Sequence, residues 1–194
     1  SVPKMIIIKA TSYGQDWCVY HEKLGNNSFL NLNGNGSAFT SSPAILNSTT
    51  PTSSLITLGS HSHVNTNNET YIAYCFAEKK GFSKFGSYTG NGNADGTFVY
   101  TGFKPAFVIF KRSSGTGNWQ LLDNKRLGYN VENRTIYPNS SIAEQDENDA
   151  DLLSNGFKLR GSGTDGNGSG STYIYMAFAE NPFVSSAGVP CTAR

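Results

Sequence analysis

Two short apolar runs near the beginning and the middle of the chain, Met5–Ile8 and Ala106–Phe110, are the first indication of its fold. Pro3 and Pro105 open these runs, and a lysine closes each one. Short runs rich in β-branched and aromatic residues, without polar alternation, indicate strands buried on both faces. Proline suits the start of a strand, where no ladder donor is required. We therefore expect two buried strands here.

The strongest strand signals are Tyr71–Ala77 and Tyr173–Ala179. Each is a continuous apolar run that follows a cluster of Gly, Asn, Ser and Thr, which are typical turn residues. We expect both runs to form central strands of their sheets. Trp17 and Trp119 begin two further strands, each after a polar loop typical of a hairpin connection.

The chain aligns with itself without a gap at one offset of 102 residues. This offset places Pro3 on Pro105, Trp17 on Trp119 and Tyr71–Ala77 on residues 173–179. Similarity at a fixed spacing is the sequence signature of a repeated structural unit. We therefore predict two tandem all-β units, residues 1–82 and residues 83–194.

Residues 83–102 have no counterpart in the first unit, because the offset would place it before Ser1. Phe85–Tyr88 and Thr97–Tyr100 indicate two short strands around an Asn- and Gly-rich turn at residues 90–96. We expect these strands to open the second unit, which would leave the first unit without its opening strands. The numbered chain would then be the C-terminal part of a longer polypeptide. In the alternative interpretation, residues 83–102 close the first unit.

One segment has a helix-like composition, Ala143–Leu153. Its counterpart at the 102-residue offset, Ser41–Pro51, contains Pro43 and ends at Pro51, so it cannot form a regular helix. We expect at most one helical turn in the second unit. The acidic run within this segment, Glu144–Asp151, is interpreted as a solvated loop.

Composition favours many short strands, because 21 glycines and abundant Asn, Ser and Thr supply turns while charged residues make up only 15% of the chain. A formal net charge of +1 provides no basic field for phosphates, so neither nucleic acid nor an anionic membrane is an expected partner. No apolar run approaches the roughly 20 residues that a membrane-spanning helix needs.

The three cysteines, Cys18, Cys75 and Cys191, lack any C-x-x-C spacing. They indicate three separate thiols rather than a disulfide framework or a zinc site. Cys18 and Cys75 lie within apolar runs, where cysteine usually acts as a small buried hydrophobe. Assembly in a reducing cytoplasm fits this pattern.

Four sequence blocks occur in order along the chain: Pro3–Lys9, Trp17–His21, Gly86–Gly92 and Tyr173–Phe183. In order and spacing they resemble a domain found in tandem in tail-fibre-like and other virion structural proteins of marine bacteriophages. The resemblance implies a β-sandwich of the jelly-roll or lectin-like kind on a virion appendage, assembled in the host cytoplasm. It also implies a homo-oligomer, most simply a trimer. A head-to-tail filament is the alternative, because repeated units with exposed strand edges can propagate by open contacts. The resemblance transfers no catalytic or ligand residue.

Aromatic side chains are the candidate ligand contacts, because their faces can stack on the apolar faces of sugar rings. Tyr13, Tyr20 and Tyr129 are the candidates for this role. Trp17 and Trp119 are interpreted as core residues, because they recur within the strand blocks. We expect ligand contacts in the loops that differ between the units, residues 25–36 and 124–141.

His61 and His63 would share one face of an extended segment and are the weak candidates for a metal site. Their counterparts at the offset are Gly163 and Asp165, so the pair does not recur, and we favour a polar loop and predict neither a metal nor another cofactor. Asn91, Asn93 and Asp95 follow the beginning of a calcium loop, but Gly102 stands where its bidentate Glu should be. We interpret this segment as a turn rich in Asn and Gly. The Gly-rich residues 161–171 are interpreted as a flexible connection.

An enzyme is not expected. Glycoside hydrolysis requires two carboxylates across a cleft, but the carboxylates that recur at the offset, Glu78 and Glu180, lie at strand ends in separate units and are interpreted as structural caps. We predict a virion structural protein that attaches to host-surface glycan, whose partners are its own copies and other virion proteins. The alternatives are a purely structural spacer or capsid-decorating module and a polysaccharide-degrading enzyme.

Overall fold

The computed structural model describes residues 1–126, 130 and 132–181. Within these ranges the regular secondary structure is entirely β, which confirms the all-β prediction, and no helix is long and apolar enough to cross a bilayer. The strands are β1 (Pro3–Ala10), β2 (Cys18–His21), β3 (Leu30–Asn31), β4 (Tyr71–Ala77), β5 (Ser83–Thr89), β6 (Phe98–Tyr100), β7 (Pro105–Arg112), β8 (Trp119–Asp123), β9 (Glu132–Thr135), β10 (Gln145–Leu153), β11 (Gly156–Leu159) and β12 (Thr172–Ala179).

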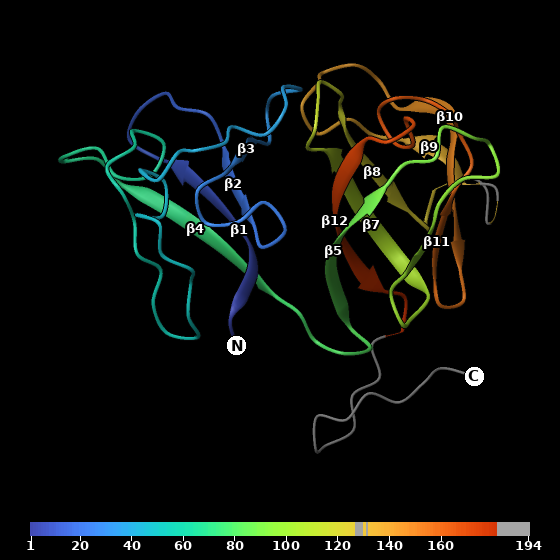
Figure 1. Ribbon diagram of the computed structural model, residues 1–194, viewed down its shortest axis with the longest axis horizontal. Coiled ribbons are helices and arrows are strands. Elements are labelled where there is room, and N and C mark those ends of the chain that lie inside the picture. Colours follow the sequence, from blue (N-terminus) through green and yellow to red (C-terminus); the bar gives the residue numbers. More distant parts are fainter. Residues whose placement is uncertain (127–129, 131, 182–194) are drawn as a thin grey trace.

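The strands form three antiparallel sheets (Figure 1). Sheet I has the order β3-β2-β1-β4, sheet II the order β5-β12-β7-β8 and sheet III the order β6-β11-β10-β9. In sheet I, Ile7 of β1 lies opposite Val19 of β2 and Tyr74 of β4. In sheet II, Ile109 of β7 lies opposite Leu121 of β8 and Met176 of β12. The paired residues of sheet II are therefore those of sheet I shifted by 102.

Sheet II is the middle layer and is buried on both faces. One face packs on sheet III through rings and aliphatic side chains that include Tyr88, Phe110, Phe157 and Tyr173. The opposite face packs on sheet I through a second cluster: Met5, Val19, Leu30, Phe85, Ile109, Trp119, Ile174 and Met176. Sheets II and III thus form a β-sandwich, and sheet I adds a third layer.

The outer face of sheet I is covered by connecting segments rather than by another sheet. Ile6 and Ile8 of β1 pack there against residues of these segments, among them Phe29, Ile45 and Val64. Because one face of β1 meets sheet II and the other meets these loops, both faces need apolar residues. This explains why Met5–Ile8 shows no polar alternation, and it confirms the predicted buried strand.

Two strand predictions are corrected by the structure. Residues 143–153 were expected to hold at most one helical turn, but Gln145–Leu153 form β10, in which Leu152 pairs with Phe157 of β11. The acidic run is consequently part of a strand and not a loop. Sheet pairing overrides local propensity here, since Ala150 and Leu152 can enter the core only in the extended form.

The second correction concerns β4, which was expected to be a central strand. Among the described residues β4 is the edge strand of sheet I, and Ile72 and Tyr74 remain 42% and 44% exposed. Its counterpart β12 is central as predicted, because β5 pairs with its second edge.

The strands predicted on either side of the turn at residues 90–96 are present, but β5 belongs to sheet II and β6 to sheet III. The turn therefore connects two layers.

Gly86 of β5 is required by this pairing. A Cβ atom at this position would lie 2.7 Å from the ring of Tyr175, which is buried across the strand. No real Cβ atom approaches an aromatic ring so closely. Glycine therefore leaves room for the Tyr175 ring beside β5 in the core between sheets II and III.

Candidate functional site

An aromatic pair on sheet I consists of Trp17, directly before β2, and Tyr74 of the edge strand β4. Their rings stack at an interplanar angle of 22° with centroids 6.5 Å apart. Tyr74 is 44% exposed and Trp17 is half-buried. The Nζ atom of Lys9 lies 6.0 Å from the centroid of Trp17. We call Trp17, Tyr74 and Lys9 the aromatic platform.

Polar side chains are fixed around Asp16, the residue that precedes Trp17. The carboxylate of Asp16 accepts hydrogen bonds from the amides of Asn31 at 2.8 Å and Asn33 at 2.7 Å. Asn33 in turn accepts a hydrogen bond from the backbone N–H of Trp17 at 2.9 Å. The Asp16 side chain remains 44% exposed. Because each carboxylate oxygen can accept more than one hydrogen bond, Asp16 can also contact a ligand hydroxyl.

The positions that match the platform in the second half of the chain are buried. Trp119 is 1% exposed, and its indole N–H donates to the backbone oxygen of Asn31 at 2.9 Å. Met176 stands at the position that matches Tyr74 and is 6% exposed. Sheet I covers the face of sheet II that carries Trp119 and Met176. The aromatic platform lies outside the contact between these two sheets. The core interpretation is thus confirmed for Trp119 only, because Trp17 is half-buried.

The lysines at matching positions in sheets I and II, Lys9 and Lys111, also differ in their surroundings. Lys111, the counterpart of Lys9, is 0% exposed and donates from Nζ to the backbone oxygens of Gly36 at 2.8 Å and Arg112 at 2.6 Å. Burial lowers the pKa of Lys111 to about 8. Lys111 therefore joins the loop at residues 25–36 to sheet II, whereas Lys9 lies at the aromatic platform.

The three tyrosines proposed from the sequence as ligand contacts do not form one surface. Tyr20 is 3% exposed and packs in the core under the outer loops of sheet I, where a ligand cannot reach its ring. Tyr13 is half-buried, and its hydroxyl bonds to Thr66 and to Tyr71 at 2.8 Å each. Tyr129 lies outside the described residues.

Sequence reasoning missed Tyr74 and Asp16 as candidate site residues. The sequence did contain a signal for Tyr74. Its counterpart at the 102-residue offset is Met176, which is not aromatic. Asp16 gave no comparable signal, since a single carboxylate in a polar loop has no distinguishing pattern. Its importance comes only from the fold, which brings Asn31 and Asn33 to it.

His61 and His63 lie close together, with ring centroids 4.6 Å apart, but both rings pack on Phe29. His63 Nε2 lies 3.9 Å from Asp16, and burial lowers the pKa of His63. Among the described residues, no group of three or more His, Cys, Asp or Glu could hold a metal ion. The histidine pair therefore packs on Phe29 within a loop.

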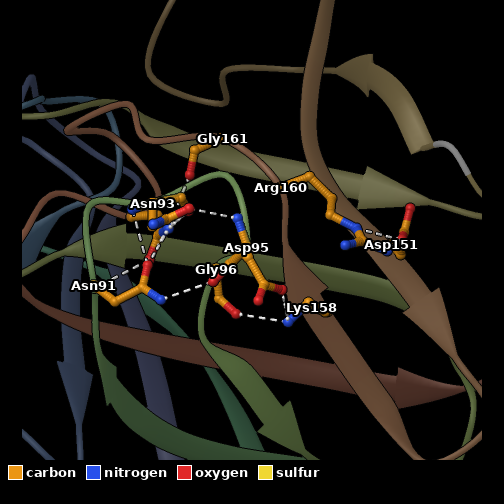
Figure 2. A network of polar contacts seen from close by, with 9 residues as sticks. Asn91, Asn93, Asp95, Gly96, Asp151, Lys158, Arg160 and Gly161 are labelled. Carbon is orange, nitrogen blue, oxygen red and sulfur yellow. Dashed lines mark hydrogen bonds and ion pairs between the residues drawn. The ribbon is translucent and has the colours of Figure 1, made fainter.

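The segment with the calcium-loop pattern has its oxygens engaged in local turns (Figure 2). Asn91 Oδ1 accepts from the backbone N–H of Asn93, and Asn93 Oδ1 accepts from that of Asp95. Asp95 pairs with Lys158 at 2.8 Å. Buried Asn167 donates to Asn91 Oδ1 and to two backbone oxygens. These bonds stabilise a turn and connect it to Asn167 of the segment at residues 161–171.

Glu78 and Glu180 follow the ends of β4 and β12, and each forms an ion pair. Glu78 contacts Lys84 at 2.9 Å, and Glu180 contacts Lys104 at 2.7 Å. Lys104 lowers the pKa of Glu180, so its carboxylate stays charged. These pairs fit the structural role expected for both carboxylates, which lie at strand ends in different sheets.

Two cysteines lie within the described residues, and both are free thiols. Cys18 is buried, as expected, and burial raises its pKa to about 12. Cys75 was also expected to be buried but is exposed, because β4 is an edge strand. Cys191 lies outside the described residues.

These observations define an all-β protein of stacked antiparallel sheets, with an exposed aromatic surface on one outer sheet. The chain matches a family model described as "Domain of unknown function (DUF7483)" over residues 1–182, and it belongs to this family. No curated protein and no solved structure matched the chain.

Proposed function

We propose that this protein is a non-enzymatic structural module of a bacteriophage appendage, and that its aromatic platform contacts host-surface glycan. The main observation in favour of the glycan contact is the stacked Trp17–Tyr74 pair, in which Tyr74 is 44% exposed and Trp17 half-buried. A pyranose ring has an apolar face that can stack on an aromatic ring, and its hydroxyls can bond to a fixed carboxylate or amide. The virion setting rests on the resemblance of the four sequence blocks.

We also propose that the chain arose by duplication of one unit. Side-chain hydrogen bonds that recur at the 102-residue offset support this origin. The backbone N–H of Thr70 donates to Ser12 Oγ, and that of Thr172 donates to Ser114 Oγ. Likewise, the backbone N–H of Lys23 donates to His21, and that of Lys125 donates to Asp123 at the matching position.

A single platform of this size supports only weak binding. Affinity at the particle would come from several copies presented together, because linked sites raise the effective concentration. We propose a homo-oligomer, a trimer or a filament, as the arrangement that provides these copies. Analytical ultracentrifugation that shows a monomer at micromolar concentration would count against it.

The glycan contact is tested by ligand-observed NMR with a panel of galactose-, mannose- and N-acetylglucosamine-containing oligosaccharides. Trp17→Ala and Tyr74→Ala should each weaken binding by about tenfold or more. Tyr100→Ala is the matched control, because Tyr100 is 63% exposed but lies on β6 in sheet III. Binding that survives both platform variants would refute the proposed site.

Experiments on the same protein can also identify two other functions. If no oligosaccharide binds and electron microscopy places the protein in a shaft or on a capsid, it is a structural spacer. If reducing sugar is released from host polysaccharide and Glu78→Gln or Glu180→Gln abolishes the release, it is an enzyme. A distal tail position, together with purified protein that blocks infection, would support attachment.

A further inference from the structure

The free edge of β4 is the most unusual surface in the described part of the chain. Sheet I ends at β4, and no strand lies on its other side among these residues. The strand consists of Tyr71–Ala77, without charge or proline, and four consecutive residues, Ile72–Cys75, are exposed. Natural proteins usually protect such an apolar edge, because its free N–H and C=O groups can pair with another chain.

The backbone groups at this edge can be assigned from the ladder. Thr11 N–H donates to the oxygen of Thr70, which lies opposite it one step beyond the Ala10–Tyr71 pair. In an antiparallel ladder, bonded and non-bonded pairs alternate along the strand. Ile72, Tyr74 and Phe76 therefore direct their backbone N–H and C=O groups toward β1. The corresponding groups of Tyr71, Ala73 and Cys75 point away from the sheet.

The second half of the chain shows what occupies the matching edge. Gly90 N–H donates to the oxygen of Ser171, so by the same alternation Tyr173, Tyr175 and Ala177 direct their backbone groups toward β5. These three residues are the counterparts of Tyr71, Ala73 and Cys75. In sheet II the edge is thus completed by β5, an antiparallel strand that presents Phe85 beside Met176 and Gly86 beside Tyr175.

We propose that the edge of β4 accepts an antiparallel strand of the β5 type, supplied by a separate domain of the same family. In the matching register, its glycine would lie opposite Ala73 and its phenylalanine opposite Tyr74. The strand would satisfy the outward N–H and C=O groups and extend sheet I beyond β4. Such an added strand would join neighbouring domains through a continuous sheet.

This inference goes beyond glycan binding and can be separated from it. The β5 strand described here is already paired with β12, so it is not free to pair with β4. The acceptor site differs from the β12 site in one residue that matters. Tyr175, whose ring prevents any Cβ at position 86, is replaced at β4 by the small side chain of Ala73.

The probe is a capped peptide with the sequence of Ser83–Thr89, added to the complete chain. Amide hydrogen exchange should slow by about tenfold or more at Tyr71, Ala73 and Cys75. The amides of Ile72 and Tyr74, which already bond to β1, should change little. A peptide with Ala at the position of Gly86 should bind equally well at β4, whereas it should pair less well with β12, where the Tyr175 ring would have to move. N-methylation of the glycine should weaken binding by at least about tenfold, since it removes a donor.

Variants of Ala73 provide the matched pair. Ala73→Pro removes an outward donor without removing a β1 ladder bond, and it should abolish peptide binding. Ala73→Thr keeps the donor and should retain affinity within about threefold. Unchanged exchange at β12 in the proline variant verifies the fold. Trp17→Ala should leave peptide binding intact even where it removes glycan binding, so failure of one proposal is distinguishable from failure of the other.

Three results would overturn the strand-acceptor proposal. The first is no protection of the outward amides at saturating peptide, and the second is equal binding by Ala73→Pro. The third is a concentration-dependent dimer that protects the same amides of Tyr71, Ala73 and Cys75 without any peptide. That result would identify a second copy of β4 as the occupant. Failure of the alanine-substituted peptide alone would place the binding at β12 instead.

Discussion

Replacing each tryptophan with alanine should have very different effects on stability, although the two residues occupy matching positions. Trp119 is 1% exposed between sheets I and II, and Trp17 is half-buried at the aromatic platform. Removing a fully buried tryptophan side chain costs about 3–5 kcal/mol, because transfer energy is lost and a cavity remains. Trp119→Ala also leaves the oxygen of Asn31 without its indole donor. The expected loss is therefore about 4–5 kcal/mol.

Trp17→Ala should cost only about 1 kcal/mol, the value of a partly solvated aromatic stack that leaves no closed cavity. Urea unfolding followed by circular dichroism measures both effects. For an m value of about 2.5 kcal/mol/M, the midpoint should fall by about 1.5–2 M for Trp119→Ala and by less than about 0.5 M for Trp17→Ala. Trp119→Phe, which keeps apolar volume but removes the donor, should lie between them.

Equal destabilisation by the two alanine variants would refute this reasoning, because it would mean that the faces of sheets I and II are equally buried. A loss below about 1 kcal/mol for Trp119→Ala would show that sheet I does not pack on sheet II in solution. An unchanged m value is required for the comparison, since a lower m would indicate that the sheets unfold separately.

Further predictions concern titration, packing and thiol chemistry. Burial lowers the pKa of His21 to about 4 and raises that of Asp149 to about 6. Because His21 binds a proton more readily in the unfolded chain, the unfolding free energy falls as pH falls from about 6.5 to 4. Asp149 has the opposite effect, because it binds a proton more readily in the folded protein, so it raises the unfolding free energy as pH falls from about 6 to 4. In Asp149→Asn only the effect of His21 should remain. Urea titrations of this variant should therefore show an unfolding free energy that rises with pH between about 4 and 6.5. Gly86→Ala in the complete chain should cost about 1–3 kcal/mol in urea unfolding, since the buried Tyr175 ring must move. A thiol reagent should modify exposed Cys75 in the folded protein, as peptide mass mapping can verify; modification only after unfolding would contradict an exposed β4.

Much of the strand framework was predictable, because hydrophobic runs report burial directly. Met5–Ile8 and Ala106–Phe110 lack alternation since each strand has a packed layer on both faces. The offset also indicated which strands would match, and the registers of β1 with β4 and of β7 with β12 agree with it. A local pattern of apolar residues is sufficient for predictions of this kind.

The failed predictions concern what lies next to each strand. The composition of Tyr71–Ala77 is that of a central strand, but composition does not specify whether a neighbouring strand is present. Residues 145–153 contain helix formers, yet pairing with β9 and β11 selects the extended form. Both outcomes depend on contacts between segments distant in sequence, where tertiary context overrides local propensity.

The candidate site was hidden for the same reason. In a stack of three layers, the middle sheet is covered on both faces, whereas an outer sheet is covered only as far as its neighbour extends. Trp119 lies under sheet I and has become part of the core, whereas Trp17 and Tyr74 extend beyond the contact with sheet II. Two sheets with the same register therefore provide one buried surface for stability and one exposed surface that is available for binding. The functional difference between them follows from position in the stack, which the repeated sequence pattern alone does not encode.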